Sequence, residues 1–99
     1  MAAGQDTFVL DLHGAFLRRV ALSRKNLTGA NFSSADFSKA DFRGSNFKDV
    51  DLKGTILKGT DLTGAKNLTP EQLAESVLDE HTKLPDYLVG KLPVAAAAE

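Results

Sequence analysis

Large hydrophobic residues recur at every fifth position, without a break, between Asp11 and Lys66. These eleven central positions hold only leucine or phenylalanine: Leu12, Leu17, Leu22, Leu27, Phe32, Phe37, Phe42, Phe47, Leu52, Leu57 and Leu62. The period fits neither an α-helix, with about 3.6 residues per turn, nor a β-strand, in which side chains alternate between two faces. A fixed period kept over this length is typical of repeat proteins, so we expect a solenoid.

The neighbours of each central residue repeat as well. Two positions before it the residue is mostly small: Leu10, Ala15, Val20, Lys25, Ala30, Ala35, Ala40, Ser45, Val50, Thr55 and Thr60. Directly before it stands mostly Asp or Asn: Asp11, Asn26, Asn31, Asp36, Asp41, Asn46, Asp51 and Asp61. The second position after it is Gly in six of the eleven units. Asp and Asn bond to nearby backbone amides and Gly tolerates a positive φ, so we expect the chain to turn within every unit.

Residues 30–34, 35–39 and 40–44 read ANFSS, ADFSK and ADFRG. These units resemble the pentapeptide repeat family, and the resemblance covers about 55 of the 99 residues. It implies an all-β solenoid, a right-handed quadrilateral β-helix in which one unit forms each side and four units form one coil. The chain would then make about three coils. Its departures from the pattern are Phe16, Ala21, Lys25 and Ile56.

Four sides of five residues place residues twenty apart above one another. The stacks expected inside the solenoid are Leu12/Phe32/Leu52, Leu17/Phe37/Leu57, Leu22/Phe42/Leu62 and Leu27/Phe47. Four phenylalanines should therefore form one buried layer between two layers of leucine. With coils about 4.8 Å apart, the column would be only about 13 Å tall, and both of its ends need a cover.

The sequence predicts a cover at each end. Thr69 and Gln72 have the spacing of a capping box, with Pro70 at the first helical position, so a helix should begin here. Its apolar face is expected to combine Leu73, Ala74, Val77 and Leu78, and Phe8, Val9 and Leu10 should close the first coil. We therefore divide the chain into an N-terminal segment (1–10, with 1–6 loose), the β-helix (11–66), a helical cap with its extension (67–90) and a disordered tail (91–99).

Composition and charge limit the chemistry. There is no cysteine, and the two histidines, His13 and His81, are far apart in the sequence. Asp41 and Asp61 should stack, but both occupy the polar turn position, so a structural role is favoured over a catalytic pair. We predict no enzyme activity and no catalytic, metal or cofactor site. The start of the chain lacks the pattern of a signal peptide and no segment is apolar enough to span a bilayer, so we expect a cytoplasmic protein without membrane contact.

One side of the expected solenoid departs from the pattern at its surface. The polar position before the central residue is hydrophobic at Phe16 and Ile56, and four cations belong to the same side: Arg18, Arg19, Lys39 and Lys58. Aromatic and Arg residues are enriched where protein interfaces anchor, so these six residues form the candidate partner surface. The alternative is that Phe16 folds under the N-terminal segment and that Ile56 is an ordinary exposed side chain. Lys25 stands at an inward position, so its side chain should extend to the open rim or distort that corner.

Three functions are open at this point. The first is a non-catalytic structural or protein-protein interaction module with an unknown protein partner, as a monomer or weak dimer. The second follows from the resemblance, because some pentapeptide repeat proteins bind DNA gyrase by imitating duplex DNA. Such mimicry needs an acidic column, whereas residues 11–66 carry ten basic and six acidic residues and residues 67–99 carry two and six. The third is weak nucleic-acid binding through the basic sides, which the scattering of the cations disfavours.

Overall fold

The computed structural model describes residues 10–91 of the chain. Its helices are α1 (Pro70–Ala74) and the short 3₁₀ helix η2 (Asp86–Leu88). The backbone before α1 is a succession of turns joined by isolated parallel β-bridges. Phe8 and Val9, which were expected to close the first coil, and the expected tail from residue 92 onwards lie outside the described residues.

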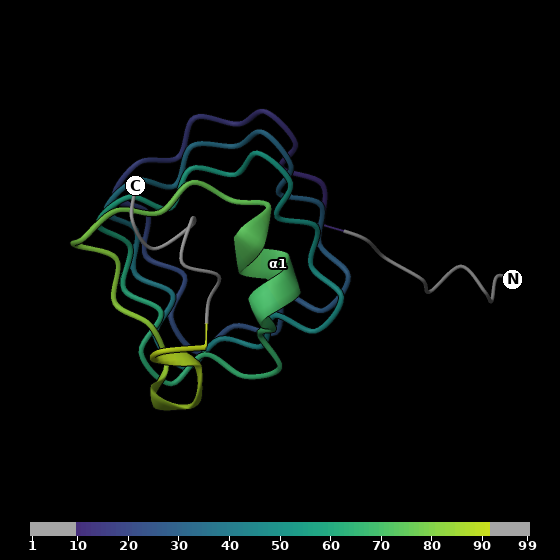
Figure 1. Cartoon of the computed structure of the whole chain (residues 1–99). Coiled ribbons are helices and arrows are strands. Elements are labelled where there is room, and N and C mark those ends of the chain that lie inside the picture. The colour runs from purple at the N-terminus through teal and green to yellow at the C-terminus, as the bar shows by residue number, and fades with distance from the viewer. Residues whose placement is uncertain (1–9, 92–99) are drawn as a thin grey trace, which may run out of the picture.

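The bridges establish the register of the coils. They join the residue before each central position to its counterpart twenty residues later, as in Asp11–Asn31 and Asn31–Asp51, and the same holds on the other sides. Figure 1 shows the result, in which successive coils lie behind one another along a common axis. The predicted spacing of twenty residues between stacked positions is confirmed.

A β-turn forms the corner after each central residue. In ten of the eleven units the backbone N–H three positions after the central residue donates to the central carbonyl, as in Ala35 N to Phe32 O at 3.0 Å. The second residue after the centre has a positive φ in every unit, whether it is Gly or not. The recurring glycines of the sequence therefore mark this left-handed position.

The four phenylalanines form the predicted layer. Phe32, Phe37, Phe42 and Phe47 are all 0% exposed. Successive rings contact one another with centroid distances of 4.7, 5.1 and 5.3 Å, in tilted or edge-to-face arrangements. The leucines of the third coil are buried above them, whereas Leu12, Leu17 and Leu22 of the first coil are only partly buried.

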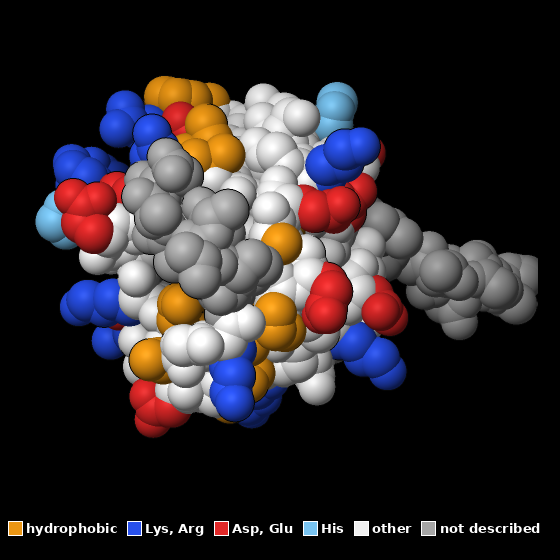
Figure 2. Space-filling view, viewed as in Figure 1, with side chains coloured by type: hydrophobic (Ala, Val, Ile, Leu, Met, Phe, Trp, Pro, Cys, Tyr) orange, Lys and Arg blue, Asp and Glu red, His pale blue; other side chains and the backbone are white. Residues whose placement is uncertain are grey.

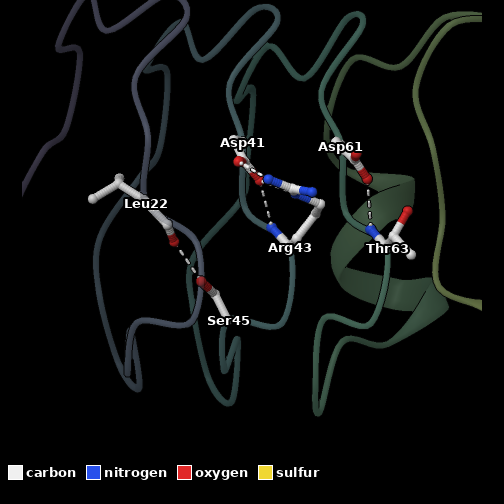
Figure 3. Close-up of polar contacts among 6 residues, drawn as sticks. All are labelled: Leu22, Asp41, Arg43, Ser45, Asp61 and Thr63. Carbon is white, nitrogen blue, oxygen red and sulfur yellow. Dashed lines mark hydrogen bonds and ion pairs between the residues drawn. The ribbon is translucent and has the colours of Figure 1, made fainter.

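Lys25 is exposed, in agreement with an extended side chain at the rim. The turn that precedes it, after Leu22, is the one that lacks the usual hydrogen bond, from Lys25 N to Leu22 O. The buried hydroxyl of Ser45, one coil away, takes that place: it accepts from Lys25 N at 3.0 Å and donates to Leu22 O at 2.5 Å. Figure 3 shows the contact between Ser45 and Leu22. A side chain from the next coil thus bonds to both backbone groups that the missing turn hydrogen bond would have joined.

The segment after the repeats differs from its prediction. The capping box of Thr69 and Gln72 is present, but α1 ends at Ala74, so Val77 and Leu78 do not extend a helical face with Leu73. Leu73 and Leu78 are buried, whereas Ala74 and Val77 are exposed. The reason is that the chain leaves the helix to continue the β-ladder.

This continuation adds backbone partners to the third coil. Val77 forms a parallel bridge with Ile56, and Lys83 forms one with Asp61. The side-chain amide of Gln72 donates to Phe47 O and Val50 O, at 2.8 and 2.9 Å. In Figure 1, α1 lies across the interior of the coil viewed end-on. Tyr87, just before the end of η2, donates from its hydroxyl to Ala65 O at 2.6 Å.

Candidate functional site

The Asp and Asn side chains before the central positions are hydrogen-bonded to their own turns. Every Asp or Asn before a central residue accepts a hydrogen bond from the backbone N–H two positions later, as Asp61 does from Thr63 at 3.0 Å. Figure 3 shows this for Asp41 and Asp61. The structural role predicted for the Asp41 and Asp61 pair is therefore confirmed.

Asp41 also forms an ion pair with Arg43. The guanidinium donates to both carboxylate oxygens, at 2.9 and 2.8 Å. These side-chain bonds, together with the bond from the backbone N–H of Arg43, lower the pKa of Asp41 to about 2. The carboxylate stays ionised at neutral pH and anchors its turn.

The six residues of the candidate surface lie on the side of the coils built around Leu17, Phe37 and Leu57, which we call the basic side. Phe16 is 72% exposed, and the guanidinium carbon of Arg18 lies 5.8 Å from the centre of its ring. Ile56 is half-buried. The four cations of this side are exposed: Arg18, Arg19, Lys39 and Lys58. The side therefore presents hydrophobic and basic groups together.

A hollow of 230 Å³ lies on the basic side. Arg18, Lys39 and Lys58 line it, and the lining is completed by Ser38, Gly59, Asp79 and His81. The structure thus brings three of the six predicted residues into one concave site. Phe16, Arg19 and Ile56 are not part of its lining.

Asp36 interrupts the hydrophobic column between Phe16 and Ile56. Its carboxylate accepts from the hydroxyl and the backbone N–H of Ser38, at 2.6 and 2.9 Å. The side-chain hydrogen bond from Ser38 lowers the pKa of Asp36, and the charges of Arg18 and Lys58 act in the same direction. Asp36 is thus ionised and turned towards its own backbone.

Three residues of this side were missed by the sequence analysis. Val77 continues the column beyond Ile56 and is 39% exposed, and Asp79 and His81 line the hollow. They lie in the segment after the repeats, where the separation from Ile56 to Val77 is 21 residues rather than twenty. In Figure 1 this segment follows the upper left edge, where Figure 2 shows hydrophobic and basic side chains next to each other.

The rest of the described chain offers less chemistry. A second hollow of 630 Å³ lies between the turn at Lys48 and the start of α1, away from all six candidate residues. Among residues 10–91 no group of three or more His, Asp or Glu side chains is placed to hold a metal ion. Nor does this part of the chain contain a helix long and apolar enough to cross a membrane.

Comparison with known proteins places this geometry in context. A family model described as pentapeptide repeats matches residues 11–49 and 45–66, with eight copies. Among proteins of curated function, none matches the chain.

The comparison with solved structures gives matches of different quality, and only the first supports a likeness in fold. QnrB1, a plasmid-mediated fluoroquinolone resistance protein, has 24% sequence identity and a TM-score of 0.66; the match covers 83% of this chain and 38% of QnrB1. The pentapeptide repeat protein alr5209 from Nostoc PCC 7120 has 26% identity, a TM-score of 0.34, and coverage of 81% and 79%. A pentapeptide repeat protein from the Arabidopsis thaliana thylakoid lumen has 22% identity, a TM-score of 0.29, and coverage of 85% and 64%. The chain therefore spans 38% of the length of QnrB1.

Proposed function

Because the chain belongs to the pentapeptide repeat family, we propose that it is a right-handed quadrilateral β-helix of about three coils that serves as a non-catalytic protein-interaction module. In this proposal α1 and the segment after it cover the C-terminal end of the coils. Continuous ladders on every side make the coil stack stiff, so its side chains are held in fixed positions relative to one another. A stiff scaffold of this kind suits recognition, because little conformational entropy is lost on binding.

The observation that carries the proposal is the exposure of hydrophobic side chains among cations on the basic side. Phe16 and Val77 are both well exposed, and Ile56 lies between them on the same ladder. Eight of the eleven units, by contrast, carry Asp or Asn at this position, and among these eight only Asp36 lies on the basic side. A hydrophobic column beside arginine and lysine has the composition of an interface anchor.

The charge of the repeats argues against imitation of duplex DNA. Residues 11–66 carry ten basic and six acidic residues, a formal charge of +4. A surface that replaces DNA must present negative charge to its partner. The likeness to QnrB1 is one of fold, and on charge the gyrase-binding alternative is disfavoured for this chain.

A pull-down with matched variants tests the proposal. The full chain is immobilised, and proteins captured from a lysate of the source organism are compared with those captured by the double variant Ile56→Asp, Lys58→Glu. Neither residue belongs to the core, and Asp is the commonest residue at the position of Ile56, present in five of the eleven units. We expect the variant to fold normally, as judged by its circular dichroism spectrum, and to lose the captured partner.

Lys53→Glu is the control for charge. Lys53 occupies the same place in its unit as Lys58, in the same coil, and is likewise exposed, but it lies on the neighbouring side. Capture should survive this change. A partner that is retained by the double variant would show that the basic side is ordinary surface and would overturn the proposal.

A further inference from the structure

The cations of the basic side form no ion pair within residues 10–91. Within residues 10–91 the ion pairs are Arg43 with Asp41 and His81 with Glu80, and neither involves this side's cations. Within the coils, Arg18, Arg19, Lys39 and Lys58 face the single carboxylate of Asp36, a formal charge of +3, and Asp79 and Glu80 of the added segment lower the charge of the whole side to +1. The Asp36 carboxylate already accepts two bonds from Ser38. The coils of this side therefore carry an excess of positive charge.

The charge of the basic side changes sign between the coils and the added segment. The position that holds Arg18 in the first coil holds Ser38 in the second and Lys58 in the third, and the hollow they line also includes Asp79 of the added segment. Glu80 follows directly and is exposed. The coils thus carry the positive charge, and the C-terminal end of the same side carries the negative charge. This arrangement favours one orientation of a charged partner bound to the side.

The hydrophobic column lies beside these cations. Phe16 and Ile56 belong to the first and third coils on one ladder, so they are two coil spacings apart, about 10 Å. Arg18 and Lys58 are separated by the same two coils. A single segment lying along the axis can therefore contact a hydrophobic residue and a cation at both levels.

Resting on the proposed function, we propose that the partner of the basic side is an acidic protein segment that also carries a hydrophobic side chain. Its carboxylates would lie over Arg18, Lys39 and Lys58, and its hydrophobic side chain against Phe16 and Ile56. Its more acidic end points to the first coil, away from Asp79 and Glu80. A nucleic acid would satisfy the cations but would leave the hydrophobic column exposed to water, which is why a protein segment fits better.

Defined polymers test this chemistry without knowledge of the natural partner. The probes are a fluorescently labelled random copolymer of glutamate and tyrosine, polyglutamate of the same length, and a labelled DNA duplex. Binding to the full chain is measured by fluorescence anisotropy at constant salt. We expect the copolymer to bind about tenfold more tightly than polyglutamate, because one desolvated hydrophobic anchor contributes about 1.4 kcal/mol or more.

Single variants assign the binding to the basic side. Lys58→Glu should weaken copolymer binding about tenfold, whereas the matched control Lys53→Glu should change it less than about twofold. Ile56→Asp should bring the copolymer close to the affinity of polyglutamate. Equal affinity for both polymers, or a copolymer affinity that responds equally to the two lysine variants, would overturn the inference.

The duplex DNA probe separates the remaining outcomes. DNA that binds as tightly as the copolymer and loses affinity in Lys58→Glu would assign the basic side to nucleic acid and overturn the inference. If the captured partner is lost in the double variant but the copolymer does not bind, the proposed protein-binding function stands and the inference that the partner is acidic is wrong. If capture is unchanged in the double variant, the proposed function itself is wrong.

Discussion

The second residue after each central position has a left-handed backbone, whatever its side chain. Arg19, Arg24, Ser34, Lys39 and Asp49 have φ values of 63°, 55°, 60°, 61° and 60° without being glycine. For an L-residue this conformation costs about 1–2 kcal/mol. The turn hydrogen bonds and ladders of the coil hold these residues there, so the strain is a property of the fold rather than of a site.

Gly29→Ala should reduce the free energy of unfolding by about 1 kcal/mol. A Cβ at Gly29 would meet nothing within 4 Å, so the cost comes from the backbone alone. Ser34→Gly is the reverse control, because it relieves the same conformation in the next unit and should not destabilise the protein. Urea unfolding followed by circular dichroism measures both. A Gly29→Ala protein as stable as wild type would show that the left-handed position carries no strain.

The Asp41 carboxylate should make the fold sensitive to acid. Its pKa of about 2 lies below the ordinary value of 3.8, so its stabilisation is fully present above about pH 4 and is lost as the pH falls towards 2. Asp41→Asn keeps an acceptor for the backbone N–H of Arg43, as Asn46 does for Lys48, but removes the charge. Between pH 4 and pH 2 the variant should therefore lose less unfolding free energy than wild type. Parallel losses in the two proteins would contradict this assignment.

At the scale of the elements, the phenylalanine layer holds the coils together. Phe37 contacts Phe32 and Phe42 and is fully buried, so Phe37→Ala should cost about 3–5 kcal/mol. Phe37→Leu leaves a smaller cavity and should cost less. Both values come from urea unfolding. Equal losses in the two variants would mean that cavity size does not govern the stability of this layer.

The sequence predicted the coils better than the segment after them. Within residues 11–66 the period is fixed, so the stacking of residues twenty apart and the phenylalanine layer follow from counting. After α1 the separations across the ladder become 21 residues for Ile56 to Val77 and 22 for Asp61 to Lys83. The hydrophobic residues that the sequence assigned to one helical face are divided in the structure. Leu73 and Ala74 belong to α1, whereas Val77 pairs with Ile56 in the β-ladder. The helix α1 interrupts the five-residue units and shifts the register of the ladder. No recurring residue pattern in the sequence marks this shift.

The same limit applies to the candidate surface. Phe16, Ile56 and the four cations could be assigned to one side because register alone decides which side a residue occupies. Val77, Asp79 and His81 could not, since their register depends on where α1 ends. The negative charge at the C-terminal end of the basic side was therefore visible only in the structure.

For the whole molecule, we expect the segment after Lys66 to be needed for solubility. It accepts backbone hydrogen bonds from the third coil, among them Leu57 N to Val77 O and Leu62 N to Lys83 O. Removal of residues 67–99 would leave these donors on an open edge above buried leucines, which favours end-to-end association. Size-exclusion chromatography should show aggregates or oligomers of the truncated chain. A folded monomer would show that this segment is dispensable.

We claim that a partner protein contacts the basic side, and site-specific crosslinking probes this contact. Benzoylphenylalanine replaces Phe16 in one protein and Ala21 in another; both are exposed residues in the same position of neighbouring first-coil units. After irradiation in lysate, we predict an adduct from position 16 that is absent from position 21 and disappears when Lys58→Glu is added. The same adduct from both positions, or none from position 16, would contradict the claim.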